Sequence, residues 1–338
     1  AARRSDHEEA RRCFERALEL DPDDGGDALY RAARLAYERG ELTVVAERLA
    51  EAAQRMLSDR TAWNLDALAA MACLRAGDVD EARRRLDAQI EQAERAGRSE
   101  ALAVALSNRG MVERRSGRLA IAVRDFEESL ECYARLGSVA GCTRVEQLLG
   151  GALREAGDLR RAETYLRRSI EAEEARSDGP LATAGRGSLG LLLADRGHVR
   201  GALDELTAGF DAVQRAGRAV DTAWMDAERA TVSARVGAGK APTAKDPTPD
   251  PRVFLASARW ARWWNRTELA TDWAQRAAVF AAKLSNASMA EEARFLELRV
   301  AGVDQLQGAD HLAAARLQGH GDEGLRAIAV APVEGPCA

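Results

Sequence analysis

The sequence predicts an all-α chain built from stacked helical hairpins, and three observations lead to this fold class. Glycines recur with a period close to 40 residues, apolar residues are spaced three and four apart, and small residues hold fixed places relative to the glycines. The phased glycines are Gly40, Gly77, Gly117, Gly157, Gly197 and Gly237. A repeat of this length indicates a solenoid, because one short unit cannot bury its own apolar face and must stack on its neighbours.

Each phased glycine is expected to end the first helix of a hairpin. Gly117 falls where a helix must stop, because glycine adopts the left-handed C-cap conformation without steric cost. The residues that follow it are spaced by three and four, which predicts one apolar face of a second helix rather than a strand. These residues are Leu119, Ala122, Phe126, Leu130 and Tyr133.

Small residues at two further places predict that the helices of a hairpin cross closely. A second glycine stands seven residues before three of the phased ones, at Gly110, Gly150 and Gly190. An alanine stands five residues after four of them, at Ala82, Ala122, Ala162 and Ala202. Because a bulky side chain would hold two helices apart, we expect Gly110→Arg to destabilise the fold strongly.

These residues resemble the tetratricopeptide repeat (TPR) family. In that pattern a small residue stands at repeat position 8, glycine near 15, alanine at 20, an aromatic residue at 24, alanine at 27 and proline at 32. The opening segment fits the second half of the pattern with Ala10, Phe14, Ala17 and Pro22. The resemblance implies a right-handed α-α superhelix of about seven to eight hairpins, a TPR solenoid. The longer period looks like the repeats of kinesin light chains and of bacterial signalling proteins.

The same phase divides the chain into four segments. Residues 1–236 form the repeat array, which starts inside the second helix of a repeat, so we expect more protein to precede Ala1. Residues 237–251 contain four prolines and predict a linker, because proline breaks helices. Residues 252–318 predict degenerate hairpins of the same kind, and residues 319–338 predict a glycine-rich tail.

Composition argues against several classes of protein. No apolar run is long enough to span a membrane. A net charge of −5 argues against general electrostatic capture of nucleic acid. The five cysteines show neither C-x-x-C nor zinc-ligand spacing, and isolated cysteines in a helical chain predict a reducing cytoplasm.

No motif in the sequence predicts catalysis. The segment GRGSLG matches a dinucleotide-binding pattern but falls within an expected helix, without the preceding strand that this function needs. Carboxylate pairs such as Glu173 and Glu174 are expected on solvated faces of second helices. No nucleophile, base and orienting group can be assembled from the sequence. We therefore expect a non-catalytic protein that needs no cofactor and no metal.

The TPR resemblance implies a ligand surface on the first helix of each hairpin. In the family these helices line a concave face, and contacts come from repeat positions 2, 5, 6, 9, 12 and 13. The residues here at those positions include Tyr30, Arg34, Arg75, Asn108, Arg114, Arg115, Arg144, Gln147, Arg154, Trp224, Arg235, Arg259, Arg262 and Trp263. Because guanidinium groups bind carboxylates in bidentate geometry, the arginines predict a groove for an acidic peptide or an acidic helix.

A second interpretation of the arginines stays open. Lys240, Lys245 and Lys283 are the only lysines among 49 basic residues, so a row of arginines also follows from composition. Arginine near a helix C-terminus is favoured by the helix dipole in any case. If the groove binds a partner, charge reversal at Arg114, Arg115 and Arg154 is expected to abolish capture without lowering the melting temperature. The tryptophans between Trp260 and Trp273 are expected to pack in a core, with Trp263 as a possible exposed anchor.

The function expected from these features is a non-catalytic protein–protein interaction module. It would bind a peptide or a partner protein in the groove, as part of a larger bacterial signalling or regulatory protein. The first alternative is a ligand- or peptide-sensing domain that controls an attached kinase or STAND-type ATPase. Two further alternatives are an enzyme whose catalytic domain precedes Ala1 and a self-assembly module that uses Trp263.

Overall fold

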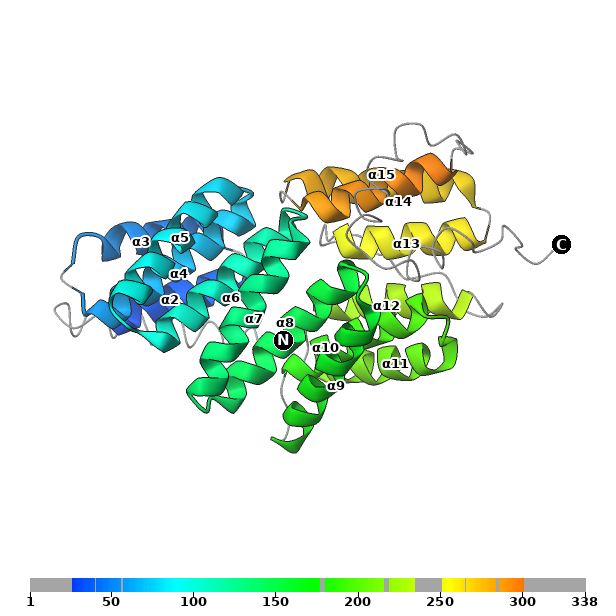
Figure 1. Cartoon of the computed structure of the whole chain (residues 1–338). Coiled ribbons are helices and arrows are strands. Elements are labelled where there is room, and N and C mark those ends of the chain that lie inside the picture. The colour runs from blue at the N-terminus through cyan, green and yellow to red at the C-terminus, as the bar shows by residue number, and fades with distance from the viewer. Residues whose placement is uncertain are drawn as a thin grey trace. The chain divides into compact units, whose positions relative to one another are not determined.

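The structure is a computed structural model that contains helices and no strand in the residues it describes (Figure 1). These residues are 26–39, 41–55, 57–176, 180–215, 219–234, 251–264, 266–283 and 286–300. The predicted all-α class is confirmed. The helices form two compact units, residues 1–112 (unit 1) and residues 113–338 (unit 2).

Unit 1 is built from hairpins whose helices pack on their neighbours in sequence. Its helices are α2 (Gly26–Arg39), α3 (Leu42–Ala52), α4 (Asp59–Ala76), α5 (Val79–Arg95) and the larger part of α6 (Ser99–Arg115). Helix α2 also packs against α4, so the first helices of two successive hairpins lie side by side. Leu29, Ala33 and Leu65 are buried where these helices meet.

Unit 2 continues the same arrangement. Its helices are α7 (Leu119–Arg135), α8 (Val139–Glu155), α9 (Leu159–Ala175), α10 (Pro180–Asp195), α11 (Val199–Arg215), α12 (Ala219–Ala234), α13 (Pro251–Trp263), α14 (Thr267–Lys283) and α15 (Ala287–Val300). Each helix packs on the next, and α10 also contacts α8 and α12. The first helices α8, α10 and α12 therefore form one layer, which α13 continues by packing on α12.

The phased glycines end first helices through a left-handed turn. Gly117 has φ 76°, its N–H donates to the Arg114 carbonyl oxygen at 3.1 Å, and the next N–H donates to the Glu113 carbonyl oxygen at 2.9 Å. These bonds satisfy carbonyl groups that a helix end leaves open, and positive φ favours glycine over other residues. Positive φ also occurs at Gly77, Gly157 and Gly197. Gly40 and Gly237 lie outside the described residues.

The second set of glycines lies where two helices of a hairpin touch. A Cβ atom added to Gly150 would stand 2.7 Å from Cγ of Leu166, and one added to Gly190 would stand 2.7 Å from Cγ of Leu206. Both distances are far inside normal carbon–carbon contact. Gly110 is buried in α6. The close crossing that small residues predict is therefore present between α8 and α9 and between α10 and α11.

Three local expectations differ from the structure or fall outside it. Helix α13 begins at Pro251, the last residue of the expected linker, because proline is well tolerated in the first turn of a helix. Glu173 is buried rather than solvated. Residues 1–25, 235–250 and 301–338 lie outside the described residues, and with them the opening TPR-like segment, the rest of the expected linker and the expected tail.

The tryptophan cluster packs mainly into a core, as expected from the sequence. Trp260 is buried between α12, α13 and α14 together with Ala234, Ala261 and Ala270, and Trp263 is partly buried against the same group. None of the described helices combines the length and the apolar character that a membrane crossing requires.

Candidate functional site: a row of ion pairs on the first helices

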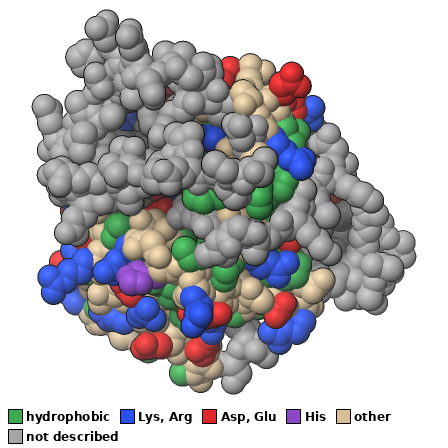
Figure 2. Space-filling model, turned by 90° about the vertical axis from the view of Figure 1, so that its right-hand side faces the viewer, with side chains coloured by type: hydrophobic (Ala, Val, Ile, Leu, Met, Phe, Trp, Pro, Cys, Tyr) green, Lys and Arg blue, Asp and Glu red, His purple; other side chains and the backbone are tan. Residues whose placement is uncertain are grey.

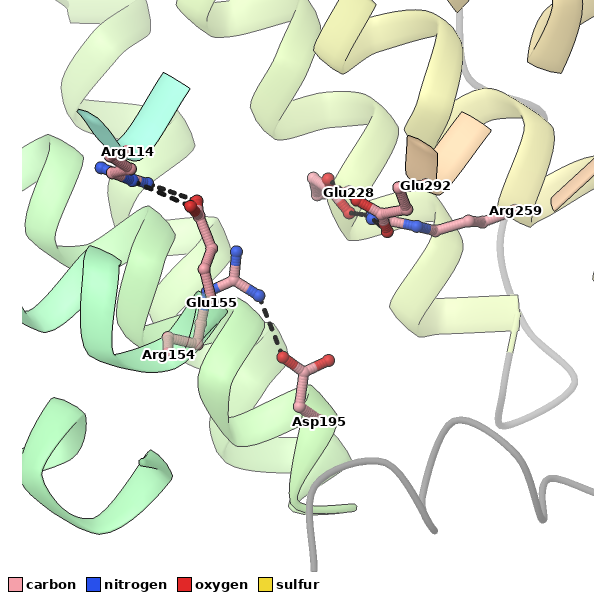
Figure 3. A network of polar contacts seen from close by, with 7 residues as sticks. All are labelled: Arg114, Arg154, Glu155, Asp195, Glu228, Arg259 and Glu292. Carbon is pink, nitrogen blue, oxygen red and sulfur yellow. Dashed lines mark hydrogen bonds and ion pairs between the residues drawn. The ribbon is translucent and has the colours of Figure 1, made fainter. Parts of the chain in front are cut away.

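Arginines and carboxylates form paired contacts along the first helices of unit 2 (Figure 3). We call this set the ion-pair row, and it consists of Arg114, Glu155, Arg154, Asp195, Glu228, Arg259 and Glu292. All of its members lie between residues 113 and 300, so the whole row belongs to unit 2.

The first member pair joins the end of α6 to the end of α8. Arg114 donates from Nε to Oε2 of Glu155 at 3.0 Å and from Nη2 to Oε1 at 2.6 Å. The side chains are 28% and 22% exposed, so both are mostly buried. Two parallel bonds of this kind fix the orientation of both groups as well as their distance.

The second pair repeats the first one repeat later along the chain. Arg154 of α8 donates from Nη1 to Oδ2 of Asp195 in α10 at 3.0 Å, again with both side chains mostly buried. In each case the arginine stands three residues before a phased glycine and its acidic partner two residues before the next one. The sequence spacing is 41 residues in both pairs. The same pairing therefore occurs in two successive repeats.

The third group is centred on Arg259 of α13. Its Nη1 lies 3.2 Å from Oε1 of Glu228 in α12, and its Nη2 donates to Glu292 in α15. Glu228 is 4% exposed. One guanidinium thus ties together three helices, and the charge of the buried Glu228 is compensated by it.

Burial and neighbouring charges shift the pKa values of this group. Burial raises the pKa of Glu228 above its ordinary value, while Arg259, Arg154 and a hydrogen bond from Trp224 act in the opposite direction without cancelling the rise. For Arg259, burial lowers the pKa but the carboxylates of Glu292 and Glu228 raise it more, so the net shift is upward. The arginine therefore stays charged, and Glu228 takes up a proton more easily than an exposed glutamate does.

Arg114 follows the same balance as Arg259. Burial lowers the pKa of its guanidinium, and the charge and hydrogen bonds of Glu155 raise it by more. Both ends of the ion-pair row therefore hold permanently charged arginines against carboxylates. An arginine that stays charged while half-buried needs a carboxylate beside it, and each pair provides one.

Comparison with known proteins agrees with this architecture. Two family models described as tetratricopeptide repeat match the chain, one at residues 58–135 and 102–175 and the other at residues 5–24. The chain carries tetratricopeptide repeats. The resemblance inferred from the phased residues is thereby confirmed. The comparison with curated proteins found no match.

Solved structures of TPR proteins share this fold. A Rap protein complexed with Competence and Sporulation Factor has a TM-score of 0.57 at 11% identity, covering 93% of this chain and 97% of that one. The apo form of RapI has a TM-score of 0.53 at 12% identity, covering 81% and 99%. A STAND protein with a TPR sensor from Pyrococcus horikoshii has a TM-score of 0.57 at 14% identity, covering 91% of this chain and 44% of that one. At these identities the likeness is one of fold.

Several residues at the TPR contact positions come together in unit 2. Arg259 pairs with the carboxylate of Glu228, Trp224 hydrogen-bonds to it, and Arg154 acts on it through its charge. The ring of Trp224 also receives the guanidinium of Arg252 at 4.9 Å from its centroid. Three of the residues that the TPR pattern selects therefore influence one buried acid, two of them by direct contact.

Other residues from the same prediction lie elsewhere. Arg144 donates to the Tyr133 hydroxyl at 3.3 Å, which ties it to the preceding helix α7. Arg75, in unit 1, stacks over the Tyr37 ring at 4.4 Å and donates to the Tyr37 carbonyl oxygen. Of the remaining described ones Arg34 is exposed, and the others are partly buried, namely Tyr30, Asn108, Arg115, Gln147, Arg262 and Trp263. Arg235 lies outside the described residues.

The sequence reasoning missed the carboxylates that complete the row. Glu155 directly follows Arg154, and Asp195 holds the equivalent place in the next repeat. A search for acids in the same phase as the arginines would have found both. Glu228 and Glu292 carry no such phase signal, because they reach Arg259 from helices on two different sides.

The row is close to neutral, which limits the chemistry that it can perform. Three arginines face four carboxylates within it. On the face of the molecule in Figure 2, basic and acidic side chains likewise lie beside one another where the surface is described. In the described part of the chain, no three His, Cys, Asp or Glu side chains gather in a way that would hold a metal ion. The arrangement offers charged hydrogen-bonding groups for binding.

Proposed function

We propose that unit 2 binds an extended peptide or a helix of a partner protein along the ion-pair row. The observation that carries this proposal is the repetition of half-buried, oriented ion pairs at the TPR contact positions of successive first helices. Charged groups that are already held in place lose little conformational entropy when they bind a ligand. The protein is then an interaction module within a larger regulatory protein.

The chemistry of the row favours a ligand that carries both charges. An acidic peptide, expected from the arginines alone, would have to displace Glu155 or Asp195 from Arg114 or Arg154. Removing one partner from a buried ion pair costs about 3–5 kcal/mol, and less where the pair is half exposed. A ligand with alternating basic and acidic side chains avoids this cost, because each arginine and each carboxylate of the row gains a partner.

Because each arginine of the row is paired with a carboxylate, the charge-reversal experiment expected from the sequence needs a different design. Charge reversal at Arg114 or Arg154 alone would leave Glu155 or Asp195 without its cation and opposite a second negative charge, and would lower stability along with binding. We therefore choose a double variant, Arg154→Asp with Asp195→Arg, which keeps an ion pair between α8 and α10 and reverses its direction. Its melting temperature should stay close to that of the wild type.

The assay uses peptides selected by display on the full wild-type chain. Their affinity for the swapped variant, measured by fluorescence anisotropy, should fall about tenfold, as expected for the loss of about 1.4 kcal/mol. The matched control swaps Arg124 and Glu128 within α7, an exposed pair at 3.9 Å on a second helix. If the selected peptides bind both swapped proteins as they bind the wild type, the row is not the binding site.

A second candidate is a sensing role in which ligand binding changes the packing of the last helices. It is supported by the way Arg259 joins α12, α13 and α15 through two carboxylates. A ligand that takes either carboxylate from Arg259 would loosen one of these contacts. Small-angle scattering with and without a selected peptide separates the two roles, since a plain interaction module keeps its dimensions.

A further inference from the structure

We propose that unit 2 carries a second binding site, a pocket between α7, α8 and α9 that holds a lysine side chain of a partner protein. The pocket has a volume of about 560 Å³. It is lined by the end of α7, the loop that follows it, the first half of α8 and the second half of α9. The ion-pair row instead uses the last residues of α8, Arg154 and Glu155, so this site does not depend on the function proposed for the row.

The lining of the pocket carries one negative charge in excess. It contains two carboxylates, Glu146 and Glu171, and a single guanidinium group, that of Arg168. Glu146 is 4% exposed, and among the described residues it pairs with Arg168 alone, whose Nη2 lies 2.7 Å from its Oε1. Glu171 is exposed and makes no hydrogen bond or ion pair with any residue that the structure describes. Because a carboxylate accepts up to about four hydrogen bonds, both acids have acceptor sites left for a cation.

The charge of the buried Glu146 is only partly compensated by its partner. The side chain of Arg168 is 61% exposed, so water screens its attraction for the carboxylate. Burial raises the pKa of Glu146, and Arg168 lowers it without cancelling the rise. A cation inside the pocket, away from bulk water, would stabilise the charged carboxylate more strongly than the exposed guanidinium does.

The helix ends around the pocket also favour a cation. Ala134 lies in the last turn of α7, and Glu171 and Ala172 lie close to the end of α9. The C-terminal end of a helix carries partial negative charge, and the N-terminal end carries partial positive charge. Two C-terminal ends therefore act against the single N-terminal end of α8.

The walls of the pocket favour a cation with an aliphatic stem. Ala134, Val139 and Ala172 line it with aliphatic groups. A lysine side chain packs its stem along such a surface and places a compact ammonium group with three donors at its end. The volume lies in the range of sites that enclose a small ligand, and a lysine with its neighbouring residues is of that size.

The rim of the pocket points to a protein as the source of the lysine. Leu136 is 47% exposed and Val139 is 62% exposed, and only one other large apolar side chain in the described part of the chain is exposed. Val139 lines the pocket, and Leu136 precedes Gly137, which lines it too. Exposed apolar side chains gathered beside a pocket are typical of protein interfaces. A free amine would leave both of them in water, whereas apolar residues next to the lysine would cover them.

The test measures binding of a rhodamine-labelled Leu-Lys-Leu peptide to the full chain by fluorescence anisotropy. A matched peptide has norleucine in place of lysine, which keeps the aliphatic stem and removes the charge. The lysine peptide should bind with a Kd of about 1 mM, and the norleucine peptide about tenfold more weakly.

Substitutions in the pocket locate the binding site. Glu146→Gln should weaken binding of the lysine peptide about tenfold, because it removes the buried carboxylate. Glu171→Gln should weaken it about two- to fivefold, the effect of one exposed ion pair. Ala172→Phe fills the pocket without changing its charge and should abolish binding. The matched controls are Glu113→Gln, a buried acid elsewhere in unit 2, and Glu94→Gln, an exposed acid of α5.

Each outcome decides for or against the pocket. Loss of affinity in Glu146→Gln and Ala172→Phe, with both controls and the Arg154/Asp195 swapped protein unchanged, supports it and separates it from the row. Equal binding of the two peptides, equal binding to Ala172→Phe and wild type, or no binding at about 10 mM peptide overturns it. Circular dichroism checks the fold of each variant, and either pocket variant decides the matter if the other fails to fold.

Discussion

Replacing Gly150 with alanine should destabilise unit 2, although alanine is the better helix former. The added Cβ would stand 2.7 Å from Cγ and 2.9 Å from Cδ2 of Leu166, and 3.3 Å from the carbonyl oxygen of Ala162. Leu166 is fully buried, so its side chain has no space to move into. The Ala162 oxygen belongs to the backbone of α9 and moves only if the helix moves.

The magnitude follows from two opposing effects. Gly→Ala inside a helix gains about 1 kcal/mol of helix propensity. Overpacking a close contact costs about 1–3 kcal/mol, and contacts as short as these lie at the upper end of that range. We expect a net loss of about 1–2 kcal/mol in the free energy of unfolding, measured by urea denaturation followed by circular dichroism.

A matched control and a second substitution make this prediction decisive. At Gly201 in α11 the nearest atom to an added Cβ is Cδ1 of Leu193 at 3.5 Å, an ordinary contact, so Gly201→Ala should stabilise the protein. Adding Leu166→Ala to Gly150→Ala should cost less than the sum of the two single changes, because it removes the clash. The reasoning about close helix crossing is wrong if Gly150→Ala is as stabilising as Gly201→Ala.

Three further predictions concern the charged groups and the thiols. Arg114→Gln should lower the free energy of unfolding by about 1–2 kcal/mol in thermal or urea melts, because it leaves the half-buried Glu155 without its bidentate partner. The raised pKa of Glu228 stabilises the fold below its ordinary value of 4.5, and this contribution is lost as pH rises through the folded-state pKa. The stability of Glu228→Gln relative to the wild type should therefore increase as the pH is raised from 4 to 7. The melting temperatures of the two proteins measure this difference. Burial raises the pKa of the Cys142 thiol, so its alkylation by iodoacetamide at pH 8, followed by mass spectrometry, should be slower than that of glutathione.

Each of these has an outcome that contradicts it. An Arg114→Gln protein as stable as the wild type would show that the pair with Glu155 contributes nothing. A constant difference in melting temperature between Glu228→Gln and wild type across the pH range would show that Glu228 titrates as it does in the unfolded chain. Alkylation of Cys142 as fast as that of glutathione would show that its thiol is not shielded.

The fold was predictable because its determinants act over short distances in the chain. A left-handed turn at Gly117 needs a glycine at that position, and a close helix crossing at Gly150 needs a missing side chain there. Both requirements restrict the residue type at one position, so each is visible in the sequence as a glycine. Repetition at a period of 40 then makes each of these glycines visible several times.

The candidate site was predictable only in part, for a physical reason. The TPR pattern selects Arg114 and Arg154 by their place on a first helix, but their partners Glu155 and Asp195 become neighbours only when successive repeats stack. Whether an arginine is available to a ligand depends on that stacking. Arg75 makes the same point, since it lies against Tyr37 rather than against a carboxylate.

The dipeptide Arg154-Glu155 bonds in both directions, forward from the arginine to Asp195 and backward from the glutamate to Arg114. Removal of one whole 40-residue unit would bring Arg114 into the register of Asp195, and duplication of a unit would insert another such dipeptide in the same register. Loss or duplication of the unit that carries this dipeptide would thus leave each arginine of these two pairs with an acidic partner in the next unit.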